Sequence, residues 1–334
     1  MNTHVVFGTG PLGRSVIHEL VAQGKKVRAV NRSGRMKDAP AEVEVVAGNV
    51  YDSGNVRELA RDAAVIYQCA QPEYTEWPEK FPPLIQAVLE GLSQTNAKLV
   101  LGDNLYMYGD TQGQPIHESL PWSAHTRKGQ TRAQVAEAVL AAHRAGKVCA
   151  TIGRASDFFG PYVLDSLFGE RAFYPVLAGK AAQMVGNLDA PHTTTYIEDF
   201  GKALVILGER EEALGQAWHV PNDQPTITQR QFMNLVFEEI GQPPRMSGMG
   251  KLMMTLGGLF IPAAREVVEM MYEFEKPFIV DSTKFERAFG MKPTPIREAV
   301  RKTVAWYRAN PKGLGLASGR DVGGETALAH DRVN

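Results

Sequence analysis

Short apolar runs alternate with amphipathic segments through the first half of the chain. The apolar runs are typical of buried strands, and they predict strands at residues 4–7, 27–30, 43–47, 64–70, 98–101 and 148–152. Between them, apolar positions spaced three and four residues apart predict helices at about residues 12–21, 56–63, 81–94 and 131–145. This alternation predicts an α/β fold with a doubly wound parallel sheet, in which ligands bind at the carboxyl ends of the strands.

The pattern loosens after Arg154, where segments rich in proline and glycine separate helices and short strands. Helical spacing returns at residues 197–207, 229–240, 263–274 and 296–308. We therefore expect a first domain at residues 1–160, joined by a return segment at about residues 195–225. A smaller, mixed C-terminal substrate-binding subdomain is expected at residues 161–310. Residues 311–334 are rich in glycine and polar residues without periodicity, which predicts a flexible tail.

A glycine-rich turn joins the first predicted strand to the first predicted helix, with the sequence Gly8-Thr9-Gly10-Pro11-Leu12-Gly13. The G-x-G-x-x-G spacing is weak evidence alone and strong evidence between a strand and a helix. Its glycines let the backbone approach a pyrophosphate, whose charge is met by free N–H groups at the helix N-terminus. The sequence therefore predicts a Rossmann domain that binds a dinucleotide through residues Gly8, Thr9, Gly10, Pro11, Leu12 and Gly13. A plain strand-to-helix turn is the alternative.

The end of the second predicted strand bears on which dinucleotide is bound. NAD sites usually place Asp or Glu there, on the adenine ribose, but this chain reads Asn31-Arg32-Ser33-Gly34-Arg35. No carboxylate would repel a 2′-phosphate, and Arg32 and Arg35 could clamp one. The sequence therefore favours NADP(H), with Asn31, Arg32 and Arg35 as contacts, and NAD(H) stays open as the alternative. Solvated loop arginines are the simplest other interpretation.

Bulk composition narrows the class of protein. The chain has 334 residues, 44% hydrophobic, with a formal net charge of −1, which gives no reason to expect nucleic-acid or anionic-membrane partners. No signal peptide and no stretch long enough to span a bilayer is visible. The two cysteines, Cys69 and Cys149, lie in apolar runs and are expected to be buried in a reducing compartment. We expect a cytoplasmic protein with a small-molecule substrate.

Several further segments occur in the order in which one known family carries them. They are Gly48-Asn49-Val50-Tyr51-Asp52, residues 68–71, Tyr106-Met107-Tyr108-Gly109, and residues 154–161, 196–199, 281–284 and 306–307. Over residues 4 to 310 the chain resembles an extended or atypical short-chain dehydrogenase/reductase, the group that contains the NAD-dependent epimerase/dehydratases. The resemblance implies a homodimer and an oxidoreductase. It also implies further cofactor contacts at Asn49, Val50, Cys69, Ala70 and Gln71.

The family's chemistry depends on a Tyr-x-x-x-Lys pair on the helix after the fifth strand, with a Ser or Thr before it. Aligned on Ala136-Glu137, this helix has Gly129 at the tyrosine position and Ala133 at the lysine position. Asn104 stands where the family has its Ser or Thr. The chain therefore resembles the family but lacks its catalytic pair.

Substitutes for that pair are expected near the same strand and helix. The catalytic candidates are Tyr106, Asn104 and Lys128, and further proton donors or orienting groups in the same segments are Asp103, Tyr108 and His125. A literal Tyr-x-x-x-Lys occurs only at Tyr272 and Lys276, in another part of the fold, and is interpreted as coincidence.

Three classes of function follow from these features. The first is an NADP(H)-dependent oxidoreductase with a non-standard active site, acting on an apolar carbonyl or alcohol. The second is a catalytically silent NADP(H)-binding sensor or regulatory protein, and the third an assembly subunit with a structural cofactor. A nucleotide-sugar epimerase or dehydratase is an alternative within the enzyme class.

Aromatic residues after the sixth strand suggest an apolar pocket, with Phe158, Phe159 and Tyr162 as substrate contacts. Methionines at residues 246–274 could extend this pocket, although core packing is the simpler interpretation. The histidines at 117, 192 and 219 lack metal-ligand spacing, so no metal site is predicted.

Overall fold

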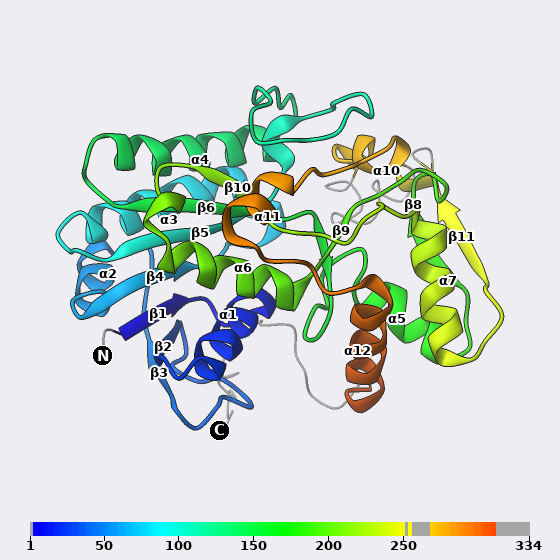
Figure 1. Ribbon diagram of the computed structural model, residues 1–334, viewed down its shortest axis with the longest axis horizontal. Helices are drawn as coiled ribbons and strands as arrows, with labels where there is room; N and C mark the ends of the chain where they lie inside the picture. Colours follow the sequence, from blue (N-terminus) through cyan, green and yellow to red (C-terminus); the bar gives the residue numbers. More distant parts are fainter. Residues whose placement is uncertain (1–2, 251–252, 256–267, 312–334) are drawn as a thin grey trace, which may run out of the picture.

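A single parallel sheet forms the centre of the molecule. The computed structural model describes residues 3–250, 253–255 and 268–311. Seven strands lie in the order β10-β6-β5-β4-β1-β2-β3, and every pair is parallel (Figure 1). Their bounds are β1 (Thr3–Phe7), β2 (Lys26–Asn31), β3 (Val43–Ala47), β4 (Ala63–Gln68), β5 (Lys98–Asp103), β6 (Ala150–Arg154) and β10 (Ala217–His219). The predicted doubly wound α/β fold is confirmed.

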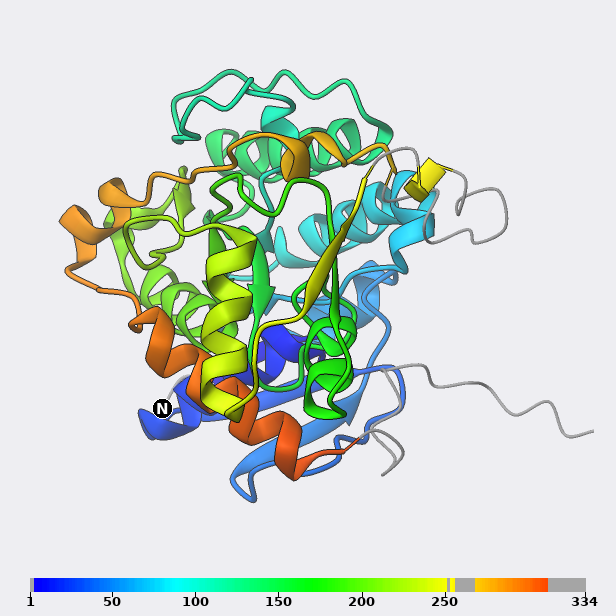
Figure 2. The same cartoon turned by 90° about the vertical axis from the view of Figure 1, so that its right-hand side faces the viewer.

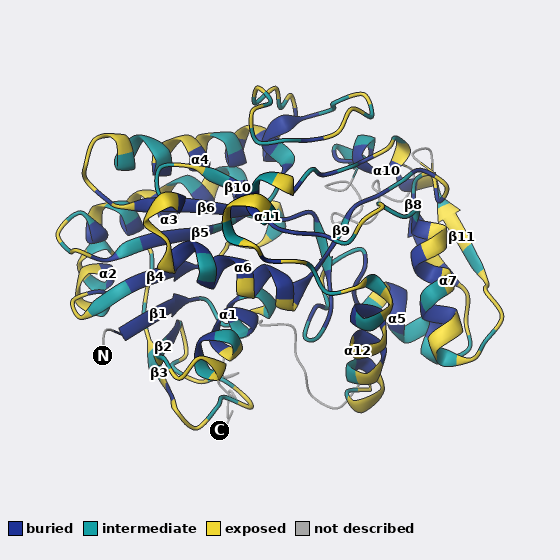
Figure 3. Cartoon of the chain, in the orientation of Figure 1, coloured by how far each residue is buried: buried dark blue, intermediate teal, exposed yellow. Residues whose placement is uncertain are grey.

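Helices cover both faces of this sheet, as crossovers between parallel strands require. One face carries α1 (Pro11–Ala22) and α6 (Ile197–Glu209). The other carries α2 (Ser53–Leu59), α3 (Trp77–Leu92) and α4 (Arg127–Arg144). The inner strands β1, β4, β5 and β6 are largely buried, the edge strand β3 is partly exposed, and the outer helix surfaces are exposed (Figure 3). Strands buried on both faces explain the continuous apolar runs in the sequence.

A smaller set of elements packs at the carboxyl edge of the sheet. Helices α5 (Glu170–Leu177), α7 (Gln229–Ile240) and α12 (Ile296–Ala309) pack together around one apolar core (Figure 2). Two short parallel sheets accompany them: β7 (Asp157–Phe159) with β9 (Thr194–Tyr196), and β8 (Ala182–Val185) with β11 (Met246–Met249). The short elements that complete the described chain are η1 (Tyr74–Glu76), η2 (Tyr106–Tyr108), η3 (Glu211–Ala213), α10 (Tyr272–Glu275) and α11 (Thr283–Phe289).

Most helix starts lie further upstream than the apolar spacing predicts. Helix α4 begins at Arg127 rather than 131, because the Thr126 side chain accepts a hydrogen bond from the backbone N–H of Gly129 and caps the helix. Helix α2 begins at Ser53 because Asp52 caps it in the same way. The predicted helix at 263–274 lies partly outside the described residues, and the predicted tail lies outside them apart from residue 311.

The prediction that both cysteines are buried is wrong for Cys149. Cys69 is largely covered, but Cys149 is exposed, because β6 begins only at Ala150 and leaves the preceding residue in the connecting loop. Of the described methionines in the methionine-rich stretch, Met254, Met270 and Met271 are buried, which favours core packing for them.

Candidate cofactor and active site

The glycine turn between β1 and α1 is held by close backbone contacts. A side chain at Gly8 would place its Cβ 2.6 Å from the backbone N of Ala70, and Gly8 has a φ of +94°. A Cβ at Gly13 would lie 1.9 Å from the carbonyl oxygen of Gly8. Both positions therefore require glycine for the fold of the turn itself.

Gly10 differs from the other two glycines of the motif, because no atom of the described residues lies within 4 Å of the place where its Cβ would be. It is the N-cap of α1, and Pro11 follows at the first helical position, where no N–H is needed. No side chain in the described part of the chain caps this helix end, so its first-turn N–H groups are available to an anion. The open space beside Gly10 fits the approach of a pyrophosphate.

Asn31, at the end of β2, organises the loop that follows it. Its Nδ2 donates to Thr9 Oγ1 (2.9 Å) and to the carbonyl of Arg35 (2.8 Å), and its Oδ1 accepts from the backbone N–H of Gly34 (2.8 Å). The side chain thereby ties this loop to the glycine turn. Arg32 and Arg35 are both exposed on the loop, and their contact with a 2′-phosphate remains a prediction.

The other predicted cofactor segments line the same edge. Asn49 follows β3, and its Oδ1 accepts from the backbone N–H of Tyr51, which closes a tight turn through Val50. The backbone N–H of Cys69 donates to the carbonyl of Phe7 (2.9 Å), which sets the adjacent Ala70 against Gly8. The structure therefore brings the predicted cofactor residues of β1, β2 and β4 together, and they fit a dinucleotide. Their contacts to it remain a prediction.

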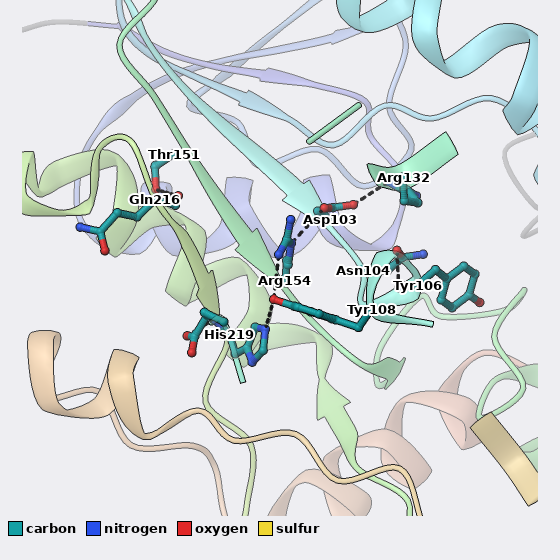
Figure 4. A network of polar contacts seen from close by, with 10 residues as sticks. Asp103, Asn104, Tyr106, Tyr108, Arg132, Thr151, Arg154, Gln216 and His219 are labelled. Carbon is teal, nitrogen blue, oxygen red and sulfur yellow. Dashed lines mark hydrogen bonds and ion pairs between the residues drawn. The ribbon is translucent and has the colours of Figure 1, made fainter. Parts of the chain in front are cut away.

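At the ends of β5 and β6, one carboxylate lies between two buried arginines. Asp103 Oδ1 is 3.2 Å from Nη1 of Arg132, which comes from α4, and Asp103 Oδ2 is 3.3 Å from Nε of Arg154 (Figure 4). Arg132 is 4% exposed and Arg154 is 0% exposed. The cluster therefore carries a net positive charge inside the protein, with Asp103 holding both cations.

Tyr108 extends this network and is fixed within it. Its hydroxyl accepts from Arg154 Nη1 (2.8 Å) and lies 2.9 Å from His219 Nε2 (Figure 4). Because the carbonyl of Asp281 can only accept, Nδ1 of His219 donates to it, and Nε2 accepts from Tyr108. Burial, with help from Arg154, lowers the pKa of His219 to about 3, so the imidazole is neutral. Both partners occupy the Tyr108 hydroxyl, so this side chain stabilises the buried network.

The positions that the sequence alignment predicts for the family's pair, Gly129 and Ala133, lie in the first two turns of α4. A Cβ at Gly129 would lie 2.6 Å from the carbonyl oxygen of Tyr106 and 2.6 Å from Cβ of Ala124. Ala133 packs against the apolar cluster that includes Leu105 and Met107. Gly129 therefore leaves no room for a tyrosine side chain on this backbone.

One residue earlier, the same spacing carries a Lys-x-x-x-Arg pair. Lys128 and Arg132 are both buried, and their four-residue separation puts them on one helix face. Lys128 Nζ lies 4.4 Å from the centre of the Tyr74 ring and 3.3 Å from Glu269 Oε1. Arg132 donates to Gln71 Oε1 (3.1 Å), beyond the end of β4. Both cations therefore lie over the carboxyl ends of the central strands.

Tyr106 and Asn104 lie beside this pair. The Tyr106 phenol is in hydrogen-bonding contact with that of Tyr74 and packs 6.0 Å from the Trp77 ring. Burial raises the pKa of Tyr106, so its phenol stays protonated and can donate a hydrogen bond. Asn104 Oδ1 accepts from the backbone N–H of Tyr106 (3.2 Å), which orients its side chain (Figure 4). The catalytic roles of Tyr106, Asn104 and Lys128 remain a prediction.

The structure does not bring the three predicted substrate aromatics together. Phe159 is 0% exposed and packs on Phe232, inside the smaller core. Phe158 packs on Phe200 of α6. Tyr162 lies 4.7 Å from the Arg14 guanidinium, on the side of α1. Their contact with substrate stays a prediction, and Phe159 has a packing role in any case.

The literal Tyr-x-x-x-Lys spacing forms no pair. Lys276 Nζ donates to Asp110 Oδ2 (2.5 Å) and to Gln112 Oε1 (2.9 Å), while Tyr272 packs on His125. Within residues 3–250, 253–255 and 268–311, no group of three or more His, Cys, Asp or Glu side chains could hold a metal ion. The same residues contain no helix that is long and apolar enough to cross a membrane.

Sequence reasoning missed two residues of this region. Arg132 could have been found, because it stands four residues after Lys128, at the family's own spacing displaced by one residue. Glu273 lies in α10, far along the chain, and no motif marks it. Only the folded chain shows that Glu273 lies within electrostatic range of Tyr74 and Tyr106.

The sheet order and the glycine turn define a Rossmann-type α/β protein. A sequence model of the NAD dependent epimerase/dehydratase family matches residues 5–220. The chain belongs to the NAD-dependent epimerase/dehydratase family.

Solved structures share the fold at low sequence identity. A dTDP-glucose 4,6-dehydratase from Bacillus anthracis, in complex with NAD, matches with a TM-score of 0.76 and 14% identity, covering 93% of this chain and 97% of that chain. A UDP-N-acetylglucosamine 4-epimerase from Bacillus cereus matches with a TM-score of 0.73 and 16% identity, covering 92% and 97%. A dTDP-glucose 4,6-dehydratase from Streptomyces venezuelae, also with NAD, matches with a TM-score of 0.75 and 17% identity, covering 92% and 97%. At these identities the likeness shows the fold.

Proposed function

We propose that this protein is an NADP(H)-dependent oxidoreductase of the short-chain dehydrogenase/reductase type that reduces or oxidises a small apolar carbonyl or alcohol compound. The observation that carries the proposal is the juxtaposition of an intact glycine turn with the buried pair Lys128 and Arg132 at the same sheet edge. When bound, the nicotinamide supplies or accepts the hydride. The side chains at the start of α4 would position the substrate.

Lys128 is the proposed contact for the substrate oxygen. Its ammonium is buried beside the aromatic face of Tyr74, where a positive charge stabilises developing negative charge on an oxygen far better than in water. Glu269 keeps this cation compensated. Tyr106, protonated because burial raises its pKa, donates a hydrogen bond, and Asn104 is the proposed second orienting group.

NADP(H) is the proposed cofactor, with NAD(H) as the alternative. Arg32 and Arg35 are exposed on the loop after β2, and Asn31 replaces the carboxylate that would repel a 2′-phosphate. NAD in two of the similar structures supports a nicotinamide dinucleotide in general and leaves the phosphate preference to experiment.

The substrate class follows from the surroundings of Lys128. Lys128 lies over the Tyr74 ring, which packs on Trp77, and Trp77 packs on Tyr106. Such an aromatic cluster suits an apolar or aromatic compound. A nucleotide-sugar epimerase or dehydratase is the second candidate, because the family match and the names of the similar structures favour it.

The test is a titration with NADPH and NADH, followed by fluorescence, together with an assay of NADPH oxidation. The panel contains aliphatic aldehydes, aryl ketones, UDP-glucose and dTDP-glucose. The proposal expects tighter binding of NADPH and turnover of at least one apolar carbonyl. Saturable binding of a nucleotide sugar without turnover of apolar carbonyls would instead favour the second candidate. Tight NADPH binding with no turnover on the full panel would favour a silent sensor.

A cytoplasmic location and a homodimer belong to the same proposal. The support is the unpaired state of both cysteines and, for the dimer, the resemblance to the short-chain dehydrogenase/reductase group. Sedimentation of the purified protein at several concentrations tests the dimer.

A further inference from the structure

Tyr162 has a backbone conformation that bulky residues rarely adopt. Its φ is +64°, in the left-handed region, although it carries a large aromatic side chain. Such a conformation is strained, and it persists only where the surrounding structure holds it. Strained residues cluster at active sites and at sites that hold ligands. The contacts of the Tyr162 ring are therefore a place to look for a functional role.

The Tyr162 ring connects α12 to α1. Trp306 of α12 packs against it, with 5.0 Å between the ring centres. Arg14, in the first turn of α1, places its guanidinium over the same ring, 4.7 Å from the ring centre. A planar guanidinium that stacks on an aromatic face is held in a defined orientation. The ring therefore fixes the direction in which the Arg14 side chain points.

Arg14 in turn holds the loop that follows β2. Its Nη1 donates to the backbone carbonyl of Lys37 (3.0 Å). The other end of the loop is held by Asn31, which ties it to the glycine turn. Arg32 and Arg35 lie between these two anchors. The loop that carries both arginines is therefore fixed at each end from the side of α1.

Stacking on Tyr162 strengthens the anchor that Arg14 supplies. Arg14 is half-buried, and a long side chain near solvent loses much of its freedom when it makes a single hydrogen bond. The Tyr162 ring restricts the guanidinium in advance, so the bond to the Lys37 carbonyl forms with a smaller loss of entropy. Removal of the ring should therefore loosen the loop without changing any residue in it.

We propose that Tyr162 and Arg14 are positioning residues for the choice of cofactor, an inference that rests on the proposed preference for NADP(H). Tyr162 orients Arg14, and Arg14 holds the loop so that Arg32 and Arg35 face the 2′-phosphate. A loop held in its binding shape loses less freedom when the phosphate binds, so NADPH binds more tightly. NADH has no 2′-phosphate and gains nothing from this order. Tyr162 thereby acts on the cofactor side rather than in the substrate pocket that the sequence predicts.

The first test separates geometry from charge. Arg14→Lys keeps the positive charge and loses the planar group that stacks on the ring. In fluorescence titrations, NADPH affinity should fall about fivefold, the size expected for the loss of one hydrogen-bonded anchor, while NADH affinity stays within twofold and shows that the protein is folded. Arg57→Lys, at an exposed position of α2, is the matched control. An Arg14→Lys protein that binds NADPH like the wild type would overturn the proposal.

The second test addresses the Tyr162 ring. Tyr162→Phe keeps the aromatic face and should bind NADPH like the wild type. Tyr162→Asn removes the ring, and asparagine tolerates the left-handed conformation, so the backbone keeps its course. This variant should lose NADPH affinity about fivefold, as Arg14→Lys does, because the same anchor is weakened. Equal NADPH affinities of Tyr162→Asn and Tyr162→Phe would show that the ring does not act on the loop.

The third test asks whether Arg14 acts through the loop arginines. Once Arg32→Ala and Arg35→Ala are both present, addition of Arg14→Lys should change NADPH affinity less than twofold, because no arginine is left to position. A further loss as large as that in the wild-type background would mean that Arg14 contacts the phosphate itself, which contradicts a positioning role.

The same titrations distinguish this inference from the function on which it rests. A wild type that prefers NADPH, with the preference retained in both Arg14→Lys and Tyr162→Asn, would overturn the positioning role and leave the proposed cofactor standing. A wild type that binds NADPH and NADH equally well would overturn the proposed preference and this inference with it.

Discussion

The glycine turn before α1 and the first turn of α4 lie at the same edge of the sheet, yet they relate to the family in opposite ways. At the turn, Gly8 and Gly13 are fixed by backbone contacts that any side chain would break. At α4, the sequence alignment predicts Gly129 at the family's tyrosine position, and the buried Lys128 and Arg132 each lie one residue before a predicted position of the pair. At such a turn cofactor binding depends on backbone shape, whereas catalysis depends on side chains, so the two expectations are tested by different variants.

The largest expected effect concerns the anchor of Arg132. Asp103→Asn would leave Arg132 and Arg154 buried without their carboxylate, and removing one partner of such a pair costs about 3–5 kcal/mol of unfolding free energy. Urea unfolding measures the loss. The matched control is Asp189→Asn, which breaks an exposed ion pair with Arg230 and should change little. Small, equal losses of unfolding free energy in both variants would show that Asp103 does not stabilise the buried Arg132 of α4.

Restoring the family's tyrosine should fail. Gly129→Tyr forces a Cβ to within 2.6 Å of the Tyr106 carbonyl oxygen, and we expect a loss of about 3 kcal/mol of unfolding free energy. Gln130→Tyr, at the exposed neighbouring position, is the control and should unfold like the wild type. A stable Gly129→Tyr protein with increased turnover would mean that the family's tyrosine position is still usable.

The glycine turn can be tested by separating its two roles. Gly10→Ala places a Cβ in open space, so stability should be unchanged, while NADPH affinity falls about 100-fold, or ~2.7 kcal/mol, because the pyrophosphate is obstructed. Gly13→Ala should lower both quantities, since its Cβ collides with the Gly8 carbonyl. Fluorescence titration and thermal unfolding measure the two effects. If Gly10→Ala binds NADPH with unchanged affinity, the cofactor does not bind at this turn.

Much of this architecture could be predicted from the sequence, because buried parallel strands produce continuous apolar runs. The predicted bounds of the third strand, Val43–Ala47, agree with the structure. The start of α4 was missed since Thr126 caps the helix four residues before the apolar spacing begins. The proximity of Glu273 to Tyr74 and Tyr106 could not be predicted, because these residues lie in segments that are distant in sequence. Local sequence patterns specify strands and turns, whereas tertiary packing determines which charged side chains lie next to each other.

The smallest expected effect is on cofactor choice. Arg32→Ala should weaken NADPH binding about tenfold, or ~1.4 kcal/mol, and leave NADH binding unchanged, because the guanidinium would face only the 2′-phosphate. Lys37→Ala, an exposed cation in the same loop, controls for general charge. The same loss in both variants would indicate a diffuse electrostatic effect rather than a clamp.

The most direct test of the separation between binding and catalysis is a paired measurement on Lys128→Met, with Gln130→Met as the exposed control on the same turn. The dissociation constant for NADPH and the kcat on a reduced carbonyl are determined for both. The account predicts a fall in kcat of about 10²- to 10⁴-fold with NADPH affinity within twofold of the wild type. Wild-type kcat in Lys128→Met, or a parallel loss of NADPH binding, would contradict it.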